Sequence, residues 1–193
     1  DLSQVNVDKL REEFKKAPFK NIEIADLRAF LQYKLDEMIA QNATRSDFAQ
    51  RLQAVIDAYN SGATATEDYY DQLTAFAEGL KAEAERHIRE GLTEDELELF
   101  DLLKKDAMTQ EETQRVKLAA KRLLKRLVEE HPKVLVQDWF KDNQTQKQVR
   151  SEIERVLDEG LPETYERTLF KQKCDNVFDL VVDYASRGRK WAA

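Results

Sequence analysis

The sequence predicts an all-α protein with no significant sheet, and three observations support this class. Only five of the 193 residues are glycine and three are proline, so residues that form turns are scarce. Charged residues make up 36% of the chain, in a composition rich in helix formers. Apolar residues recur at steps of three and four positions, as they do on one face of an amphipathic helix. We expect an irregular helical domain of about seven to eight helices in two lobes.

The first half of the chain contains a weak helix pattern, which ends near Pro18, followed by three strong ones. The first strong stripe faces a core, and its members are Ile24, Leu27, Leu31, Leu35 and Met38. Thr44 is expected to cap the next helix, and Gly62 to end it, because glycine readily adopts positive φ. Thr66 is expected to open a third helix that runs to Gly91. The apolar stripe of this third helix is Tyr69, Tyr70, Leu73, Phe76, Ala77, Leu80, Ala84 and Ile88.

Two capping boxes predict helix starts in the second half. Thr93 is followed three positions later by Glu96, and Thr109 is followed in the same way by Glu112. The helix after Thr109 is expected to end at Pro132.

Two further segments lie beyond this helix. Residues 134–136 read Val-Leu-Val, which fits either an extended connector or a helix start. Pro162 is expected in the first turn of the last helix, which carries an apolar stripe from Tyr165 to Val182.

Composition and charge limit the class of protein. No composition break divides the chain, so we expect one domain over residues 1–193, with a soft division near 91–92 between the two helical lobes. The net charge of −7 argues against a protein that coats nucleic acid with its whole surface, so a DNA contact must be local. No apolar run approaches the ~18 residues that a membrane span needs. We expect a soluble, cytoplasmic protein without a membrane partner.

Common catalytic and cofactor motifs are absent from the sequence. There is no Gly-rich phosphate loop and no zinc-binding pattern around His87 or His131, the two histidines. Cys174 has no histidine that can be assigned as its base, so a packing role is favoured over a nucleophile. Acidic residues between 94 and 98 crowd a helix start, where the helix dipole stabilises them. We therefore expect no metal, cofactor or catalytic residue in this chain.

A basic helix is the strongest candidate for a functional surface. Residues 113–128 contain no acidic residue and six basic ones: Arg115, Lys117, Lys121, Arg122, Lys125 and Arg126. On a helical wheel these side chains lie outside the apolar arc that runs from Val116 to Leu127. The positive surface could contact DNA phosphates. Alternatively, it could be solvated, bind another protein or pair with the acidic residues between 90 and 101.

Two tryptophans mark further candidates. Trp139 follows a short apolar run, and it fits either a core anchor or an exposed docking residue. Trp191 belongs to a basic tail with Arg187, Arg189 and Lys190. This tail is expected to be frayed, although it could contact a partner or phosphate.

Local motifs in a fixed order resemble the C-terminal helical region of the motor (restriction) subunit of type I restriction–modification enzymes. Asp138 with Trp139, and Leu161 and Pro162 with Tyr165, are the clearest of them. The other matching segments are residues 42–48, 57–62, 90–97, 99–103, 116–117, 144–145, 149–150 and 172–175. The chain departs from the pattern at Phe140 and Gln146, where the family often has basic residues.

The resemblance implies a segment of an ATP-dependent DNA translocase and endonuclease, and the first residue, Asp1, fits a piece of a longer chain. ATP, magnesium and the nuclease site would belong to the subunit's other domains, leaving no enzyme activity here. Its partners would be the rest of the motor subunit, the specificity and modification subunits of the methyltransferase core, and double-stranded DNA. Arg150 joins the basic helix as a candidate DNA contact. The alternative is a structural spacer or protein-interaction domain without DNA contact.

Overall fold

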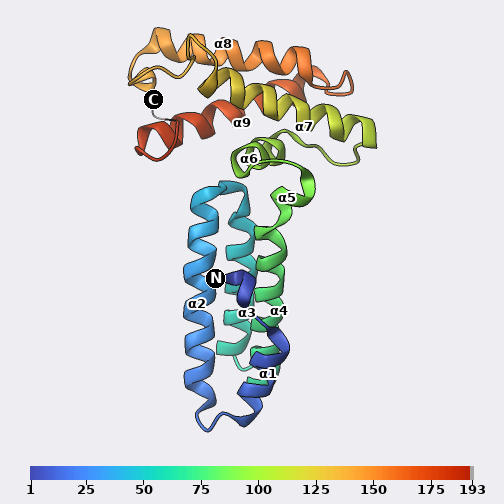
Figure 1. The fold of residues 1–193 in the computed structure, drawn as a ribbon, viewed down its shortest axis with the longest axis vertical. Coiled ribbons are helices and arrows are strands. Elements are labelled where there is room, and N and C mark those ends of the chain that lie inside the picture. Colours follow the sequence, from blue (N-terminus) through green and yellow to red (C-terminus); the bar gives the residue numbers. More distant parts are fainter. Residues whose placement is uncertain (192–193) are drawn as a thin grey trace. The chain divides into compact units, whose positions relative to one another are not determined.

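The computed structural model describes residues 1–191, and within that range the chain is entirely helical apart from its connections (Figure 1). Nine α-helices and no strand occur in these residues, which confirms the all-α class. The helix count exceeds the expected seven to eight. One reason is that the helix predicted from Thr66 to Gly91 is interrupted at Glu85, giving α4 (Thr66–Ala84) and the short α5 (Arg86–Glu90).

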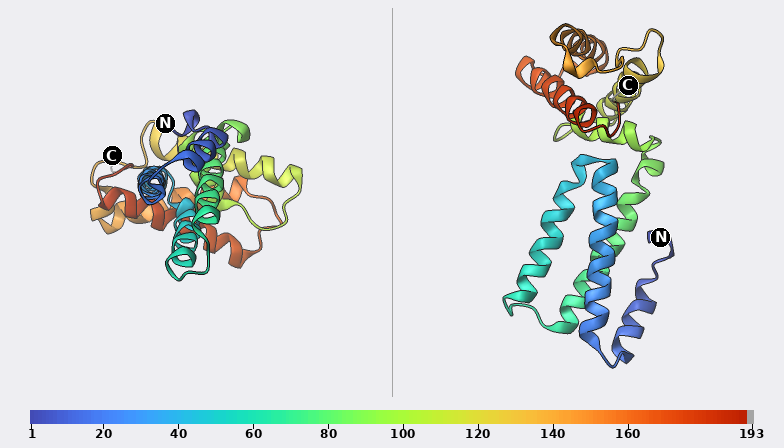
Figure 2. Two further views of the ribbon diagram at one scale, coloured as in Figure 1. Left: turned by 90° about the horizontal axis from the view of Figure 1, so that it is seen from below. Right: turned by 90° about the vertical axis from the view of Figure 1, so that its left-hand side faces the viewer.

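The chain divides into two compact units, Asp1–Gly91 and Leu92–Ala193, and each has its own hydrophobic core. The N-terminal unit begins with α1 (Val7–Lys16), α2 (Lys20–Gln41) and α3 (Ser46–Asn60). Helices α2, α3 and α4 lie side by side, and α1 packs against α4 (Figure 2).

Aromatic stacking joins the helices of the N-terminal unit. Phe14 of α1 stacks on Tyr70 of α4 with ring centroids 3.8 Å apart, and Tyr59 of α3 stacks on Tyr69 with centroids 4.1 Å apart. Leucines on the inward faces of α2, α3 and α4 fill the space between them and are fully buried. The apolar stripes therefore meet in one core, as their periodicity predicts.

The predicted cap of α3 is wrong. Helix α3 begins at Ser46 without a side-chain cap, and Thr44 lies in a short 3-10 turn before it. The side chain of Asn42 caps that turn by accepting a hydrogen bond from the backbone N–H of Thr44 (3.0 Å). The hydroxyl of Thr44 donates to the same Asn42 oxygen (2.6 Å), a local side-chain contact in place of the expected cap. Gly62 does adopt positive φ (78°) after α3, as predicted.

The C-terminal unit contains α6 (Glu94–Leu103), α7 (Gln110–Leu124), α8 (Asn143–Gly160) and α9 (Arg167–Ser186). Helix α6 contacts α7 and α9, and α8 also contacts α7 and α9, so the four helices enclose one core. A π-helical segment, Lys125–Glu129, continues α7. Both predicted capping boxes are confirmed, at the starts of α6 and α7.

Gly160 lets α7 and α8 approach closely. A Cβ atom at this position would lie 3.0 Å from the Cβ of Ala119, which is tighter than ordinary side-chain contact. Ala119 is itself fully buried. The pairing of a glycine with an alanine therefore sets how near the two helices lie.

Pro162 does not open the last helix, because α9 begins at Arg167. Residues 161–166 instead form a turn in which the hydroxyl of Tyr165 donates a hydrogen bond to the carbonyl of Leu103 (2.7 Å). This long-range bond and the burial of Tyr165 hold the segment outside the helix. The connector before Trp139 is irregular; Leu135 is buried there and its N–H donates to the carbonyl of Leu127.

Candidate nucleic-acid interface

Intramolecular contacts engage three of the predicted DNA-binding arginines. The guanidinium of Arg115 binds the carboxylate of Glu163 at 2.9 Å and the carbonyl of Leu161 at 3.1 Å. Arg126 binds the carboxylate of Glu152 at 3.1 Å and the carbonyl of Pro132 at 3.2 Å.

The third engaged arginine is Arg150, whose guanidinium lies 2.5 Å from the carboxylate of Asp175 and 4.1 Å from the centroid of the Phe178 ring. Because all three charges are matched by carboxylates of the same unit, these arginines fit structural roles better than phosphate contacts.

Three of the six basic residues of the basic helix are exposed and remain as candidate DNA contacts. We call them the cationic face of α7: Lys121, Arg122 and Lys125. Their side chains are exposed, and within residues 1–191 none of the three forms an ion pair or hydrogen bond. Lys121 and Arg122 lie in the last turn of α7, and Lys125 begins the π-helical segment that continues it. The helix dipole favours positive charge at this end. Leu118, one turn earlier on the same side, is 48% exposed. Lys117 is set apart, with its ammonium 5.8 Å from the centroid of the Phe100 ring.

The acidic residues between 90 and 101 were an alternative partner for the basic helix. Two of them, Asp95 and Glu98, instead bind the ammonium of Lys190, at 2.6 and 2.9 Å. The carboxylates that bind Arg115 and Arg126 come from outside the acidic run. The ion pairs of these two arginines therefore do not follow the internal pairing considered from the sequence.

The prediction that the C-terminal tail is frayed is wrong for residues 187–191. The ammonium of Lys190 lies over the rings of Tyr184 (4.8 Å) and Trp191 (4.7 Å), in addition to its carboxylate partners. The hydroxyl of Tyr184 donates to Glu98 (2.5 Å), which is fully buried. Several cation–π and charge contacts thus fix the tail to α6 and α9.

The motif residues around Trp139 form contacts within the C-terminal unit. Trp139 is 1% exposed, and the hydroxyl of Thr145 donates to its carbonyl at 2.6 Å. Asp138 adopts positive φ (58°) and pairs with Lys141 at 2.9 Å. The amide of Gln146, at a position often basic in the family pattern, donates to the carbonyl of Phe140 (2.6 Å). Leu161, Pro162 and Tyr165 are buried in the turn before α9.

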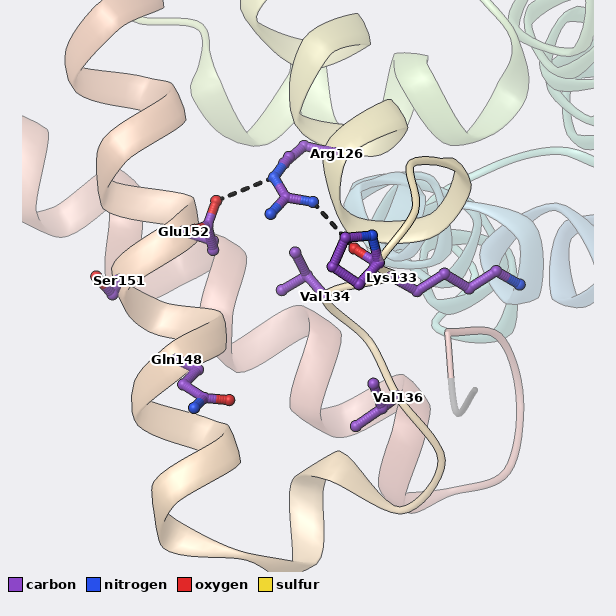
Figure 3. A pocket seen from close by; sticks show the side chains of 8 residues that line it. Arg126, Lys133, Val134, Val136, Gln148, Ser151 and Glu152 are labelled. Atoms are coloured by element: carbon purple, nitrogen blue, oxygen red, sulfur yellow. Dashed lines mark hydrogen bonds and ion pairs between the residues drawn. The ribbon is translucent and has the colours of Figure 1, made fainter.

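A cavity of about 300 Å³ lies beside the end of α7 (Figure 3). Arg126 and Glu152 form one wall and pair with each other, so the arginine's charge is already matched. Val134 and Val136 give the cavity an apolar side, and Lys133 at its edge is exposed. This combination does not make an anion site, because its best-placed cation is neutralised.

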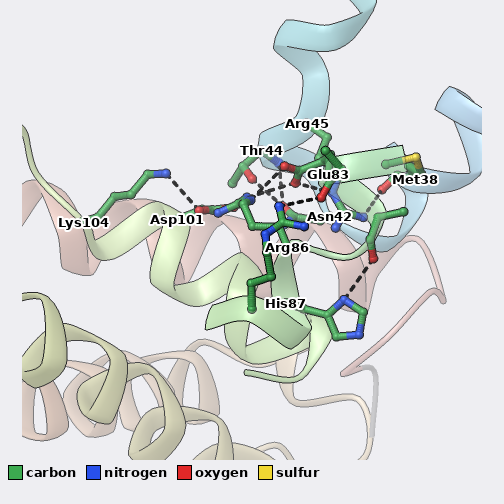
Figure 4. Close-up of polar contacts among 12 residues, drawn as sticks. Met38, Asn42, Thr44, Arg45, Glu83, Arg86, His87, Asp101 and Lys104 are labelled. Atoms are coloured by element: carbon green, nitrogen blue, oxygen red, sulfur yellow. Dashed lines mark hydrogen bonds and ion pairs between the residues drawn. The ribbon is translucent and has the colours of Figure 1, made fainter. Parts of the chain in front are cut away.

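The N-terminal unit contains a buried polar cluster at the end of α2 and the start of α3 (Figure 4). Glu83 accepts from Arg45 at 3.0 Å and from Arg86 at 2.8 Å. Arg45 also donates to the carbonyl of Met38 (3.3 Å) and is 2% exposed. The cluster joins three helix ends and satisfies the hydrogen-bonding groups of a buried arginine, which is a structural role.

The candidate nucleophile and the candidate metal ligands do not come together in the described part of the chain. Residues 1–191 hold no group of three or more histidine, cysteine and acidic residues that could bind a metal ion. Cys174 is buried, and this burial raises the pKa of its thiol to about 12. Nδ1 of His87 lies 3.1 Å from the carbonyl of Ala84, a local helix contact. None of the described helices is long and apolar enough to cross a membrane.

Comparison with known proteins gave one match. Residues 1–186 match a family described as type I restriction enzyme HindI endonuclease subunit-like, C-terminal. No curated protein and no solved structure matched the chain. The match covers both compact units, and therefore includes the cationic face of α7.

Proposed function

Because the chain belongs to the family of C-terminal domains of type I restriction enzyme HindI endonuclease subunit-like proteins, we propose that it is the assembly and DNA-contacting module of such a subunit. In this proposal the module holds the motor subunit on a methyltransferase core of specificity and modification subunits. ATP hydrolysis and magnesium-dependent DNA cleavage belong to other domains of the subunit, and the module has no catalysis of its own.

The cationic face of α7 carries the DNA part of the proposal. The chain has a net charge of −7, yet three adjacent cations on this face have no intramolecular partner in the described residues. Lys121 and Lys125 are separated by about 6 Å along the helix axis, because each residue rises 1.5 Å. Phosphates of one DNA strand repeat every 3.4 Å or so along the duplex axis, so the face spans about two of them. Such contacts would be independent of base sequence.

Leu118 favours a second candidate, protein interaction without DNA contact. Its half-exposed side chain lies beside Lys121 and Arg122, where a phosphate backbone would gain nothing from an apolar group. A protein partner with an acidic and apolar surface would use all four residues. The two candidates differ in whether the salt dependence of DNA binding changes when the cations are removed.

The experiment replaces Lys121, Arg122 and Lys125 together with glutamine. Duplex DNA binding by the purified chain is measured as a function of salt concentration. Each neutralised phosphate contributes about −0.9 to the slope of log affinity against log salt, so the slope should flatten by about 2 for two phosphates and by at most ~2.7 for three.

The matched control removes the same charge elsewhere, at Lys147, Arg167 and Lys171, which are exposed and unpaired among residues 1–191. Equal slopes for the two triple variants would refute DNA contact at this face. If the triple variant of the cationic face binds DNA normally but no longer binds the methyltransferase core, the second candidate is supported. ATP turnover or DNA cleavage by the purified chain would refute the absence of catalysis.

A further inference from the structure

Helix α2 is apolar on two opposite sides. Its inward side carries the buried stripe from Ile24 to Met38. On the outward side Ile22 and Tyr33 are 57% and 59% exposed, and Ala29 and Ala40 lie on the same line along the helix. These four positions fall within an arc of about 40° at 100° per residue. We call them the outer stripe of α2.

The neighbouring helix of the same unit shows that an exposed apolar stripe is not general there. The outward side of α3 is formed by polar residues such as Gln50, Arg51, Gln53 and Asp57, all of them exposed. A surface helix normally pairs one apolar face with one polar face. The outer stripe of α2 departs from that pattern, and an exposed apolar stripe is a candidate contact surface.

The charged residues beside the outer stripe indicate what kind of partner surface would bind there. By position on the helix, the charged residues within about 60° of the stripe are Asp26, Asp36 and Glu37. Glu37 is paired with Lys34 at 2.7 Å, and the Lys34 ammonium also lies 5.1 Å from the centroid of the Tyr33 ring. Asp26 and Asp36 are therefore the carboxylates beside the stripe that have no cationic partner within residues 1–191. Asp26 forms no ion pair or hydrogen bond within residues 1–191. The hydroxyl of Tyr33 donates to Glu37 at 3.0 Å, which fixes the ring along the helix surface.

We infer that the outer stripe of α2 binds a helix of a partner protein whose apolar or small side chains are bordered by lysine or arginine. An apolar strip bordered by carboxylates matches such a helix in both hydrophobicity and charge. DNA would bring phosphates to the same carboxylates, and a second copy of this stripe would bring identical ones, so both are disfavoured by like charge. The inference rests on the proposed assembly role and assigns its protein contact to α2.

The test measures binding of the purified chain to a purified methyltransferase core. Ile22→Glu with Tyr33→Glu should weaken binding at least tenfold, because two exposed anchors become charges that face the partner. A second variant, Asp26→Lys with Asp36→Lys, should also weaken it without removing apolar surface. The control is Ile88→Glu with Val136→Glu, the same chemical change at residues that are 69% and 46% exposed and lie outside α2 and outside the cationic face. Circular dichroism should show all three variants to be folded, since every altered side chain is exposed.

The outcomes separate this inference from the proposed function. If the wild-type chain fails to bind the core, the assembly role is overturned, and the inference with it. Wild-type binding that the α2 variants leave unchanged overturns the inference alone. If only the control pair weakens binding, the contact lies outside α2, and the inference is overturned. Self-association of the wild-type chain that the Ile22 and Tyr33 changes abolish would show a second copy as the occupant.

Discussion

The indole Nε1 of Trp139 donates a hydrogen bond to the main-chain carbonyl of Trp191, 3.1 Å away. Trp139 also meets the rings of Phe140 and Phe178 edge to face. One buried side chain thereby joins the irregular connector before α8, the last helix and the C-terminal tail. This explains how a segment without regular structure has a defined path.

Replacing Trp139 should separate packing from this hydrogen bond. Trp139→Ala is expected to destabilise the C-terminal unit by ~3–5 kcal/mol, the range for truncating a large buried aromatic side chain. Trp139→Phe keeps most of the apolar volume and loses the hydrogen bond, so a smaller cost near ~1–2 kcal/mol is expected. Urea unfolding followed by circular dichroism measures both. A cost below about 0.5 kcal/mol for the alanine variant would contradict the buried position.

Lys190 is expected to stabilise the C-terminal unit more than an ordinary surface lysine does. Lys190→Met removes the charge that lies against buried Glu98 and should cost about 2 kcal/mol. The control is Arg187→Met, because Arg187 pairs with Asp183 at 2.8 Å but both side chains are well exposed. That pair should be worth less than ~1 kcal/mol. Equal costs in urea unfolding would mean that the Lys190 contacts contribute no more than a surface pair.

Local chemistry decides which parts of this fold could be predicted from the sequence. The two capping boxes were predicted correctly because donor and acceptor lie three residues apart, within one helical turn. The cap at Thr44 failed because the Thr44 hydroxyl donates to the side-chain oxygen of Asn42 (2.6 Å), and α3 begins without a side-chain cap. Pro162 was misplaced because its segment is held by the bond between Tyr165 and Leu103, residues 62 positions apart.

The candidate site shows the same limit. Charge and periodicity predict a basic outer side for α7, yet they do not tell which cations are available. Arg115, Arg126 and Arg150 have carboxylate partners 48, 26 and 25 positions away, which only the packing of α8 and the segments after it brings near. The outer stripe of α2 was missed although Ile22 and Tyr33 are visible in the sequence. The stronger stripe on the other side of α2 accounts for the helix by itself.

Cys174 is expected to be inert in the folded chain. Its thiol is buried and its pKa is raised to about 12, so the reactive thiolate is scarce at pH 8. Iodoacetamide should therefore modify native protein at pH 8 very slowly and should modify protein unfolded in urea rapidly. The extent of modification is measured by mass spectrometry. Labelling at similar rates in both states would show that the thiol is exposed and would remove the packing role.

Glu112 should make the stability of the C-terminal unit depend on pH in the acid range. Hydrogen bonds from the Thr164 hydroxyl and from the backbone N–H of Thr109 hold the pKa of Glu112 at about 2, below its ordinary value. A carboxylate with a lowered pKa in the folded state stabilises that state above its unfolded pKa, and this stabilisation is lost as pH falls toward the folded value. Wild type should therefore be more stable than Glu112→Gln at pH 7, and the difference should shrink steadily from about pH 5 to about pH 2.

Urea unfolding at pH 7, 4 and 3 measures this difference between wild type and Glu112→Gln. Glutamine is a suitable replacement because its one carbonyl oxygen can still accept the backbone hydrogen bond of the capping box. The substitution removes the charge and the acceptor for the Thr164 hydroxyl. Glu111→Gln is the control, since Glu111 lies beside it in the first turn of α7 but forms no hydrogen bond or ion pair in residues 1–191. Its substitution should change stability less at pH 7. A difference for Glu112→Gln that grows as pH falls would mean that the carboxylate is destabilised in the folded chain, contrary to its hydrogen bonds.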